Sequence, residues 1–166
     1  MNIRYSKRHL THFLAATSIL LLSACASVSG PQPVAATIAS NPELSTLSGL
    51  ISKAGLTAKL NGEGSFTVFA PNNEAFKAVP AKTMDEMAAN PARLTQVLTY
   101  HVLASKAMSK DVKDGSVKTL QGGNIALAKA GDFVTVEDAV VQTADINATN
   151  GVVHIVDRVL LPPAHK

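Results

Sequence analysis

The chain has 166 residues, a single cysteine, no tryptophan and a formal net charge of +3. The excess charge comes from Arg4, Lys7 and Arg8, because the first 24 residues contain no acidic residue and the remainder is formally neutral. A neutral domain lacks the basic field on which non-specific nucleic-acid binding depends, and a single cysteine excludes a disulfide within the chain. We therefore expect no nucleic-acid partner.

Residues 1–24 have the pattern of a secretory signal. Three cationic residues precede an uncharged, largely apolar stretch over residues 10–22, which is too short for a comfortable membrane span. The stretch runs into LSAC at residues 22–25, which resembles the bacterial lipoprotein box. The resemblance implies cleavage before Cys25, a diacylglyceryl group on its sulfur and acylation of the new terminal amine. The alternative is an ordinary signal peptide followed by a free thiol, which is unusual in an exported chain.

Residues 25–34, CASVSGPQPV, are small and polar with two prolines, which is typical of a short tether between lipid and domain. If flexible, ten such residues have a root-mean-square reach of roughly 17 Å. We therefore expect the domain to lie close to the membrane surface. Residues 35–163 have the size of one globular domain, and residues 164–166 are a C-terminal tail.

The first part of this domain has mainly helical signals. Between residues 42 and 60, leucine, isoleucine and alanine recur at helical spacing, with an interruption or an end near Gly55. A turn over residues 61–65 then precedes a strand over residues 66–70, which is rich in aromatic and β-branched residues.

Three further helix starts follow. Asn72 or Asn73 has a side chain suited to cap the first, and Thr83 and Glu86 have the spacing of a capping box for the second. Asn90 is followed by a proline, which is a frequent first residue of a helix. The sequence therefore predicts helices that begin near these positions.

After residue 103 the pattern changes to short apolar runs separated by turn residues, as in a β-meander. Asn150 and Gly151 are residue types that tolerate positive φ in a tight turn before the last strand. Because helices come first and strands later, the sequence predicts the α+β class.

Three segments are diagnostic together: FTVFAPNNEAF at residues 66–76, LTYHVL at 98–103 and DINATNGVVHIVDRVLLP at 145–162. They resemble the characteristic motifs of the fasciclin domain, although Asn72 stands where the family commonly has threonine. The resemblance implies a compact α+β wedge of two small β-sheets with helices packed on one side. The residues that match the family motifs are Phe69, Pro71, Asn73, Phe76, Asn150, Gly151, His154 and Asp157.

Fasciclin domains occur in adhesion proteins and in secreted or surface-anchored bacterial proteins, and they share no catalytic constellation. The resemblance thus implies a lipid-anchored envelope protein that binds another cell, a surface or another envelope macromolecule. The alternative is a periplasmic carrier of a small apolar ligand held between helices and sheet. Because Ala26 and not aspartate follows Cys25, we expect the periplasmic leaflet of the outer membrane if the host has two membranes.

His101, His154 and nearby carboxylates such as Asp145 and Asp157 supply the groups of a metal site. The two histidines are far apart in sequence, however, and no helix carries an i, i+4 histidine pair. We therefore expect no metal and no other cofactor. A neutral His154, packed among aliphatic residues and paired with backbone or a carboxylate, fits the apolar strand better.

The resemblance implies that the segment with Tyr100 and His101 is a candidate adhesive determinant. Tyr100 has an apolar face and a polar end, which suits an interface anchor. The alternative is that Tyr100 closes the core at a helix-to-strand junction. The chain has no Gly-x-Ser-x-Gly or Ser-x-x-Lys motif, and its cysteine is assigned to lipid, so we expect no enzyme.

Overall fold

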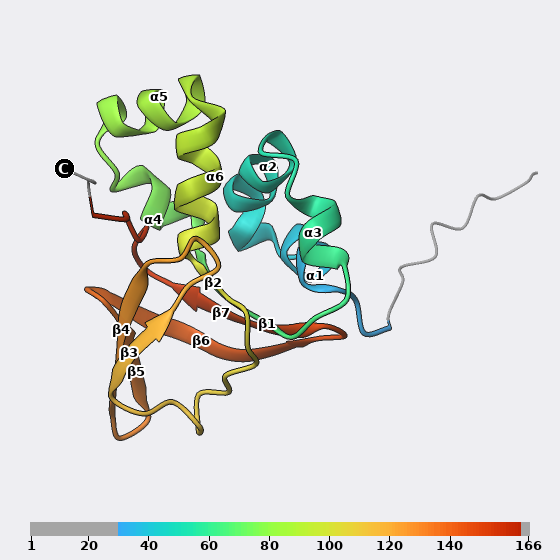
Figure 1. Ribbon diagram of the computed structural model, residues 1–166, viewed down its shortest axis with the longest axis vertical. Helices are drawn as coiled ribbons and strands as arrows, with labels where there is room; N and C mark the ends of the chain where they lie inside the picture. Colours follow the sequence, from blue (N-terminus) through green and yellow to red (C-terminus); the bar gives the residue numbers. More distant parts are fainter. Residues whose placement is uncertain (1–29, 164–166) are drawn as a thin grey trace, which may run out of the picture.

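The computed structural model describes residues 30–163. Helices gather on one side of a strongly curved sheet, and the two ends of the described chain lie on opposite sides of the molecule (Figure 1). The elements in chain order are α1 (Val34–Ala39), the 3₁₀ helix η1 (Pro42–Leu44), α2 (Ser45–Lys53), α3 (Thr57–Asn61), β1 (Phe66–Pro71), α4 (Asn73–Lys77), α5 (Ala81–Ala89), α6 (Pro91–Tyr100), β2 (Val102–Leu103), β3 (Gly115–Lys118), β4 (Asn124–Ala130), β5 (Phe133–Val136), β6 (Ala139–Ala148) and β7 (Gly151–Val156).

The seven strands form one mixed sheet in the order β2-β1-β7-β6-β5-β4-β3. β1 and β7 are parallel, and the other neighbours are antiparallel. The two edges of the sheet meet at a bridge between Leu103 and Thr119. Beside this bridge, the N–H of Leu120 donates to the carbonyl of Val102 at 2.6 Å. The sheet is therefore nearly closed.

The prediction of two small β-sheets is wrong, because β6 joins both halves of a single sheet. Its first residues pair with β5, and most of the strand pairs with β7. Register shifts between Val141 and Thr143 and between Thr143 and Ile146 interrupt the ladder, and such irregularities bend a strand. Asp145, inside the second shift, has a φ of 59°. The bent strand can follow the curved sheet while the strand order stays continuous.

Both faces of the central strands are buried. One apolar cluster, between helices and sheet, includes Val68 and Ala70 of β1, and the other, enclosed by the curved sheet, includes Phe69. Successive side chains of β1 thus alternate between two cores. Every residue of β1 and β7 is buried, which explains why both strands are near-continuous apolar runs.

Two of the predicted helix caps are confirmed, and one is wrong. The Asn72 side chain accepts from the N–H of Ala75 at the start of α4, and Asn90 caps α6. α5 instead begins at Ala81, so Thr83 lies within its first turn and makes no capping bond. Ala81 and Lys82 are good helix formers, so α5 begins directly after Pro80, whose ring fixes φ near the helical value.

The N-terminal end of the domain is fixed by contacts that the sequence did not predict. Val34 is fully buried and starts α1, and the carbonyl of Gln32 accepts from the N–H of Thr149 at 2.9 Å. Part of the predicted tether therefore belongs to the domain. The signal, Cys25 and the predicted tail lie outside the described residues. Within residues 30–163, no helix is long and apolar enough to cross a membrane.

Candidate functional site

His154 occupies the middle of β7 with only 2% of its surface exposed. Its ring stacks on Phe69 of β1, with centroids 5.5 Å apart and an interplanar angle of 24°. Nδ1 accepts from the N–H of Asp145 at 3.1 Å, and Nε2 donates to the carbonyl of Ala107 at 2.9 Å. Burial lowers the pKa of His154, against the opposing effects of the Ala107 carbonyl and the Asp145 carboxylate. The ring is therefore neutral, with its proton on Nε2.

Buried polar groups fasten the loop between β2 and β3 to the sheet. Thr67 Oγ1 donates to the carbonyl of Ser105 at 2.6 Å and accepts from the N–H of Ala107 at 2.8 Å. Asp145 accepts from the N–H of Ser109 at 2.8 Å and from its hydroxyl at 2.5 Å. Neither Thr67 nor Ser109 was predicted from the sequence. Thr67 could have been recognised, because it is the one hydroxyl residue in the apolar strand β1.

The Asp145 carboxylate is charged. Burial by itself would raise the pKa of Asp145, but both hydrogen bonds from Ser109 and the nearby His154 and Lys110 lower it below its usual value. The loop is thus held by an ionised carboxylate on one strand and a neutral imidazole on the next.

His101 follows the last residue of α6 and is 2% exposed. Nδ1 donates to the carbonyl of Val97 at 2.7 Å, and Nε2 accepts from the N–H of Leu160 at 2.8 Å. Burial lowers the pKa of His101 to about 4, opposed by the Val97 carbonyl. His101 therefore joins α6 to the C-terminal segment as a neutral ring.

Tyr100 is 4% exposed and packs in the cluster enclosed by the curved sheet. Its hydroxyl donates to the carbonyl of Asn124 at 2.9 Å. Burial raises the pKa of Tyr100, and the charge of Glu137 acts in the same direction. The side chains of Tyr100 and His101 are thus mainly core groups, although Tyr100 also lines a surface hollow beside Leu161.

Asn73 and Asn150 each fasten a helix that lies far away in the sequence. Oδ1 of Asn73 accepts from the N–H of Thr46 at 3.0 Å, and its Nδ2 donates to the carbonyl of Pro42 at 3.0 Å. Oδ1 of Asn150 accepts from the N–H of Val34 at 2.8 Å. Each side chain therefore supplies an acceptor to first-turn amides, as a local N-cap does, but from another part of the chain.

Asn150 lies in the turn between β6 and β7, as expected, but neither it nor Gly151 has a positive φ. Nδ2 of Asn150 instead donates to the carbonyls of Leu60 and Gly62, both at 2.8 Å. A Cβ at position 151 would lie 2.2 Å from the carbonyl oxygen of Phe66. Glycine is needed there for close approach of two parallel strands and not for turn geometry.

The remaining motif residues also have structural contacts. Pro71 and Phe76 are buried. Oδ1 of Asp157 accepts from the N–H of Val140 at 2.7 Å, and the N–H of Asp157 donates to the carbonyl of Val140. Asp157 thus fixes the start of β6.

Ser109, Asp145 and His154 include the residue types of a hydrolytic triad, but their connections differ from one. In a triad the histidine contacts the serine hydroxyl, and the carboxylate orients the histidine. Here the serine hydroxyl bonds to the carboxylate, and both imidazole nitrogens are bonded to backbone groups. His154 therefore cannot act as the base that activates Ser109 in a triad. Among residues 30–163, no cluster of three or more His, Cys, Asp or Glu residues could hold a metal ion.

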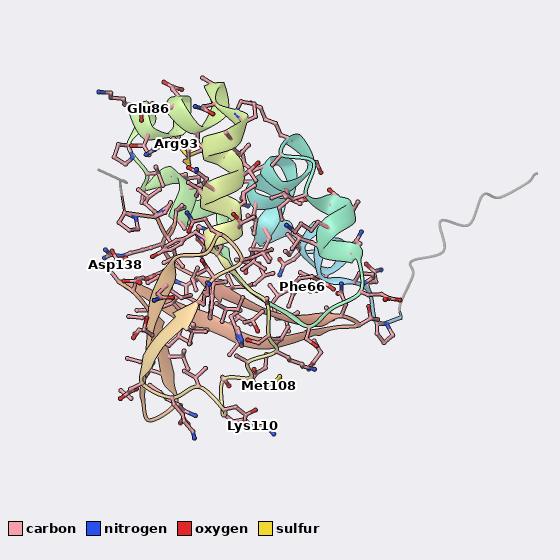
Figure 2. All side chains as sticks on the ribbon, in the orientation of Figure 1. Phe66, Glu86, Arg93, Met108, Lys110 and Asp138 are labelled. Carbon is pink, nitrogen blue, oxygen red and sulfur yellow. The ribbon has the colours of Figure 1, made fainter. Side chains whose placement is uncertain are left out.

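Two adjoining hollows open on the surface, of about 550 Å³ and about 370 Å³. Both include Asp138 and Leu161, and the larger has apolar lining from Ala78, Val79 and Pro80. Asp138 lies at the side of the molecule opposite the first described residues (Figure 2). A third hollow, of about 640 Å³, lies at the seam between β2 and β3.

The comparisons with known proteins agree with this fold. A model of the Fasciclin domain family matches residues 42–162. The chain is 41% identical over 127 residues to protein sll1483 of Synechocystis sp., which covers 75% of this chain and 71% of that protein. It is 40% identical over 146 residues to the immunogenic protein MPB70 of Mycobacterium bovis, covering 84% and 75%.

The cell surface glycolipoprotein MPB83 of Mycobacterium bovis is 39% identical over 137 residues, which are 80% of this chain and 61% of that protein. A solved FAS1 domain pair from the insect cell adhesion molecule Fasciclin I superposes with a TM-score of 0.61 at 17% identity, covering 79% of this chain and 51% of that one. That similarity supports the fold alone. The family match and these relatives together establish that the chain belongs to the fasciclin domain family.

Proposed function

We propose that this chain is a lipid-anchored envelope protein whose fasciclin domain acts by contact with another macromolecule and not by catalysis. The observation that carries this proposal is that the two histidines within residues 30–163, His101 and His154, use both ring nitrogens to bond backbone groups. The groups most suited to acid–base chemistry are thereby committed to holding the fold. The name of MPB83, a cell surface glycolipoprotein, supports a place in the envelope.

The start of the domain fits anchoring through Cys25. Gln32 and Val34 are bonded to Thr149 and Asn150 at the turn between β6 and β7. Six residues lie between Cys25 and Gln32 in the sequence, so the seven steps from one to the other span at most about 25 Å even when extended. A lipid on Cys25 would therefore keep the β6–β7 turn near the bilayer, in our proposal the periplasmic leaflet of an outer membrane if the host has two.

The test compares the wild type with Cys25→Ala and, as a matched control, Ser27→Ala in the native host. The wild type and Ser27→Ala should incorporate an alkyne-labelled fatty acid, fractionate with membranes and be cross-linked to the same envelope macromolecules. Cys25→Ala should lose all three properties. Equal labelling or equal membrane retention of Cys25→Ala would contradict anchoring, and undiminished cross-linking of the released protein would contradict a contact function that depends on membrane placement.

A second candidate function is transport or storage of a small apolar ligand. It is favoured by the size of the larger hollow beside Leu161, since small-molecule sites usually measure about 300–1,000 Å³. Native mass spectrometry of the lipidated protein, purified gently from its own envelope, tests this function. A stoichiometric mass that disappears on denaturation would support a carrier. A bare acylated monomer would contradict it.

A further inference from the structure

We propose that the two adjoining hollows around Leu161 form a docking surface for a protein segment with an apolar side chain flanked by lysine or arginine. This inference rests on the proposed contact function, because it names the surface and the partner chemistry that such a function would use. We call this region the Leu161 surface. It consists of the residues that line the hollows of about 550 Å³ and about 370 Å³.

The apolar part of the Leu161 surface is held in place by its neighbours. Leu161 is 44% exposed, whereas Leu160 beside it is 2% exposed and donates its N–H to His101. The core therefore takes Leu160 and leaves Leu161 at the surface. Leu161 is one of three large apolar residues exposed in the described part of the chain. An exposed aliphatic side chain beside a hollow is typical of an interface anchor.

The charges of the Leu161 surface determine the kind of partner. Three carboxylates line the hollows, those of Glu137, Asp138 and Asp157, and the one lining cation is Arg158. Arg158 is paired with Asp138 at 3.0 Å. The lining therefore carries a formal charge of −2, from three carboxylates and one guanidinium. Such a surface attracts a cationic segment and repels anionic lipid headgroups and nucleic acid.

The acidic groups are also positioned before any partner arrives. Glu137 accepts from the N–H of Ala126 at 2.8 Å, and Asp157 accepts from the N–H of Val140 at 2.7 Å. Fixed carboxylates lose little conformational entropy on binding. Asp138 of the Leu161 surface lies on the side of the molecule away from the start of the described chain (Figure 2). A protein tethered through its N-terminus would therefore present this surface to partners on the side away from the bilayer.

The experiment uses the full lipidated chain in nanodiscs as bait for a phage-displayed library of random peptides. Recovered peptides should be enriched in lysine and arginine beside leucine, valine or phenylalanine. A recovered peptide is then synthesised, and Leu161→Asp and Asp138→Lys should each reduce its affinity for the protein by about tenfold or more. Raising the salt concentration from about 50 mM to about 500 mM should reduce the affinity of the peptide for the wild type. Phe133→Asp is the matched control, because Phe133 is 68% exposed and lines neither hollow.

Acidic or uncharged peptides, peptides whose affinity is unchanged in Leu161→Asp, or no enrichment at all would each overturn the proposal. A small molecule that co-purifies with the wild type but not with Leu161→Asp would also overturn it, because the hollow would then belong to a carrier. Cross-linking in the native host separates this proposal from the proposed function. If Leu161→Asp is cross-linked to the same envelope macromolecules as the wild type while Cys25→Ala is not, the contact function stands and the Leu161 surface is excluded.

Discussion

The backbone N–H of Asp145 donates to Nδ1 of His154 across the β6–β7 pair, at 3.1 Å. Because this bond requires an unprotonated Nδ1, the proton of the neutral ring lies on Nε2 and is donated to Ala107. The carboxylate of the same Asp145 accepts from Ser109. Two residues on neighbouring strands therefore hold one loop at two points, which gives a structural reason for a histidine inside an aliphatic strand.

Replacing His154 with leucine should destabilise the domain by about 1–3 kcal/mol, because a half-buried carbonyl and a half-buried N–H lose their partners. Urea unfolding would measure the loss, and hydrogen exchange should show faster exchange around Ala107 and Ser109. Ser109→Ala removes one hydroxyl bond to a carboxylate, so it should cost about 1–3 kcal/mol. An unchanged exchange rate at Ala107 in His154→Leu would refute the fastening role.

Acid should destabilise the protein through His101. Its pKa is lowered to about 4 in the fold and is about 6.5 when unfolded, so between these values the unfolded chain binds more protons. The free energy of unfolding should therefore decrease as the pH falls from 6.5 to 4, by about 3 kcal/mol from this group. The lowered pKa of His154 acts in the same direction.

Urea titrations at a series of pH values measure this dependence. His101→Gln lacks the titrating ring, so its curve should be flatter between pH 4 and 6.5 even if its overall stability is lower. A wild-type stability that is constant over this interval, or a His101→Gln curve as steep as that of the wild type, would show that His101 is not responsible.

Gly151→Ala and Gly49→Ala should have opposite effects. The Cβ at position 151 would overlap the backbone carbonyl of Phe66, so the parallel β1–β7 pairing must separate and folding should fail. A Cβ at position 49 meets nothing within 4 Å, and glycine within α2 costs about 1 kcal/mol relative to alanine. Thermal denaturation should show an increased Tm for Gly49→Ala. A folded Gly151→Ala domain with a wild-type Tm would disprove the close approach.

Tyr100→Ala should reduce stability by about 3–5 kcal/mol, as expected for a large aromatic ring removed from a core. Tyr100→Phe keeps the ring and loses the bond to the Asn124 carbonyl, so its cost should be about 1 kcal/mol. Any loss of adhesion should then follow the loss of folded protein, which circular dichroism measures on the same samples. Loss of adhesion in a Tyr100→Ala protein with a normal Tm would instead support direct contact by the ring.

Local chemistry made several features predictable. Asn72 and Asn90 cap helices a few residues away, and the interruption near Gly55 coincides with a φ of 68°. Long-range features were not predictable in the same way. Asn150 looks like a turn residue, yet its side chain binds Val34, more than a hundred positions earlier.

Periodicity, caps and turns act over a few residues, so they were enough to predict the α+β class, the positions of most helices and strands and the segments that identify the family. The closure of the strands into one sheet, the burial of Tyr100 and His101 and the exposure of Leu161 became known from the three-dimensional arrangement. These features depend on which distant segments pair. The parallel pairing of β1 with β7, for example, places Phe69 beside His154. Because backbone N–H and carbonyl groups are nearly the same in every residue, the sequence does not show which distant strand they will pair with.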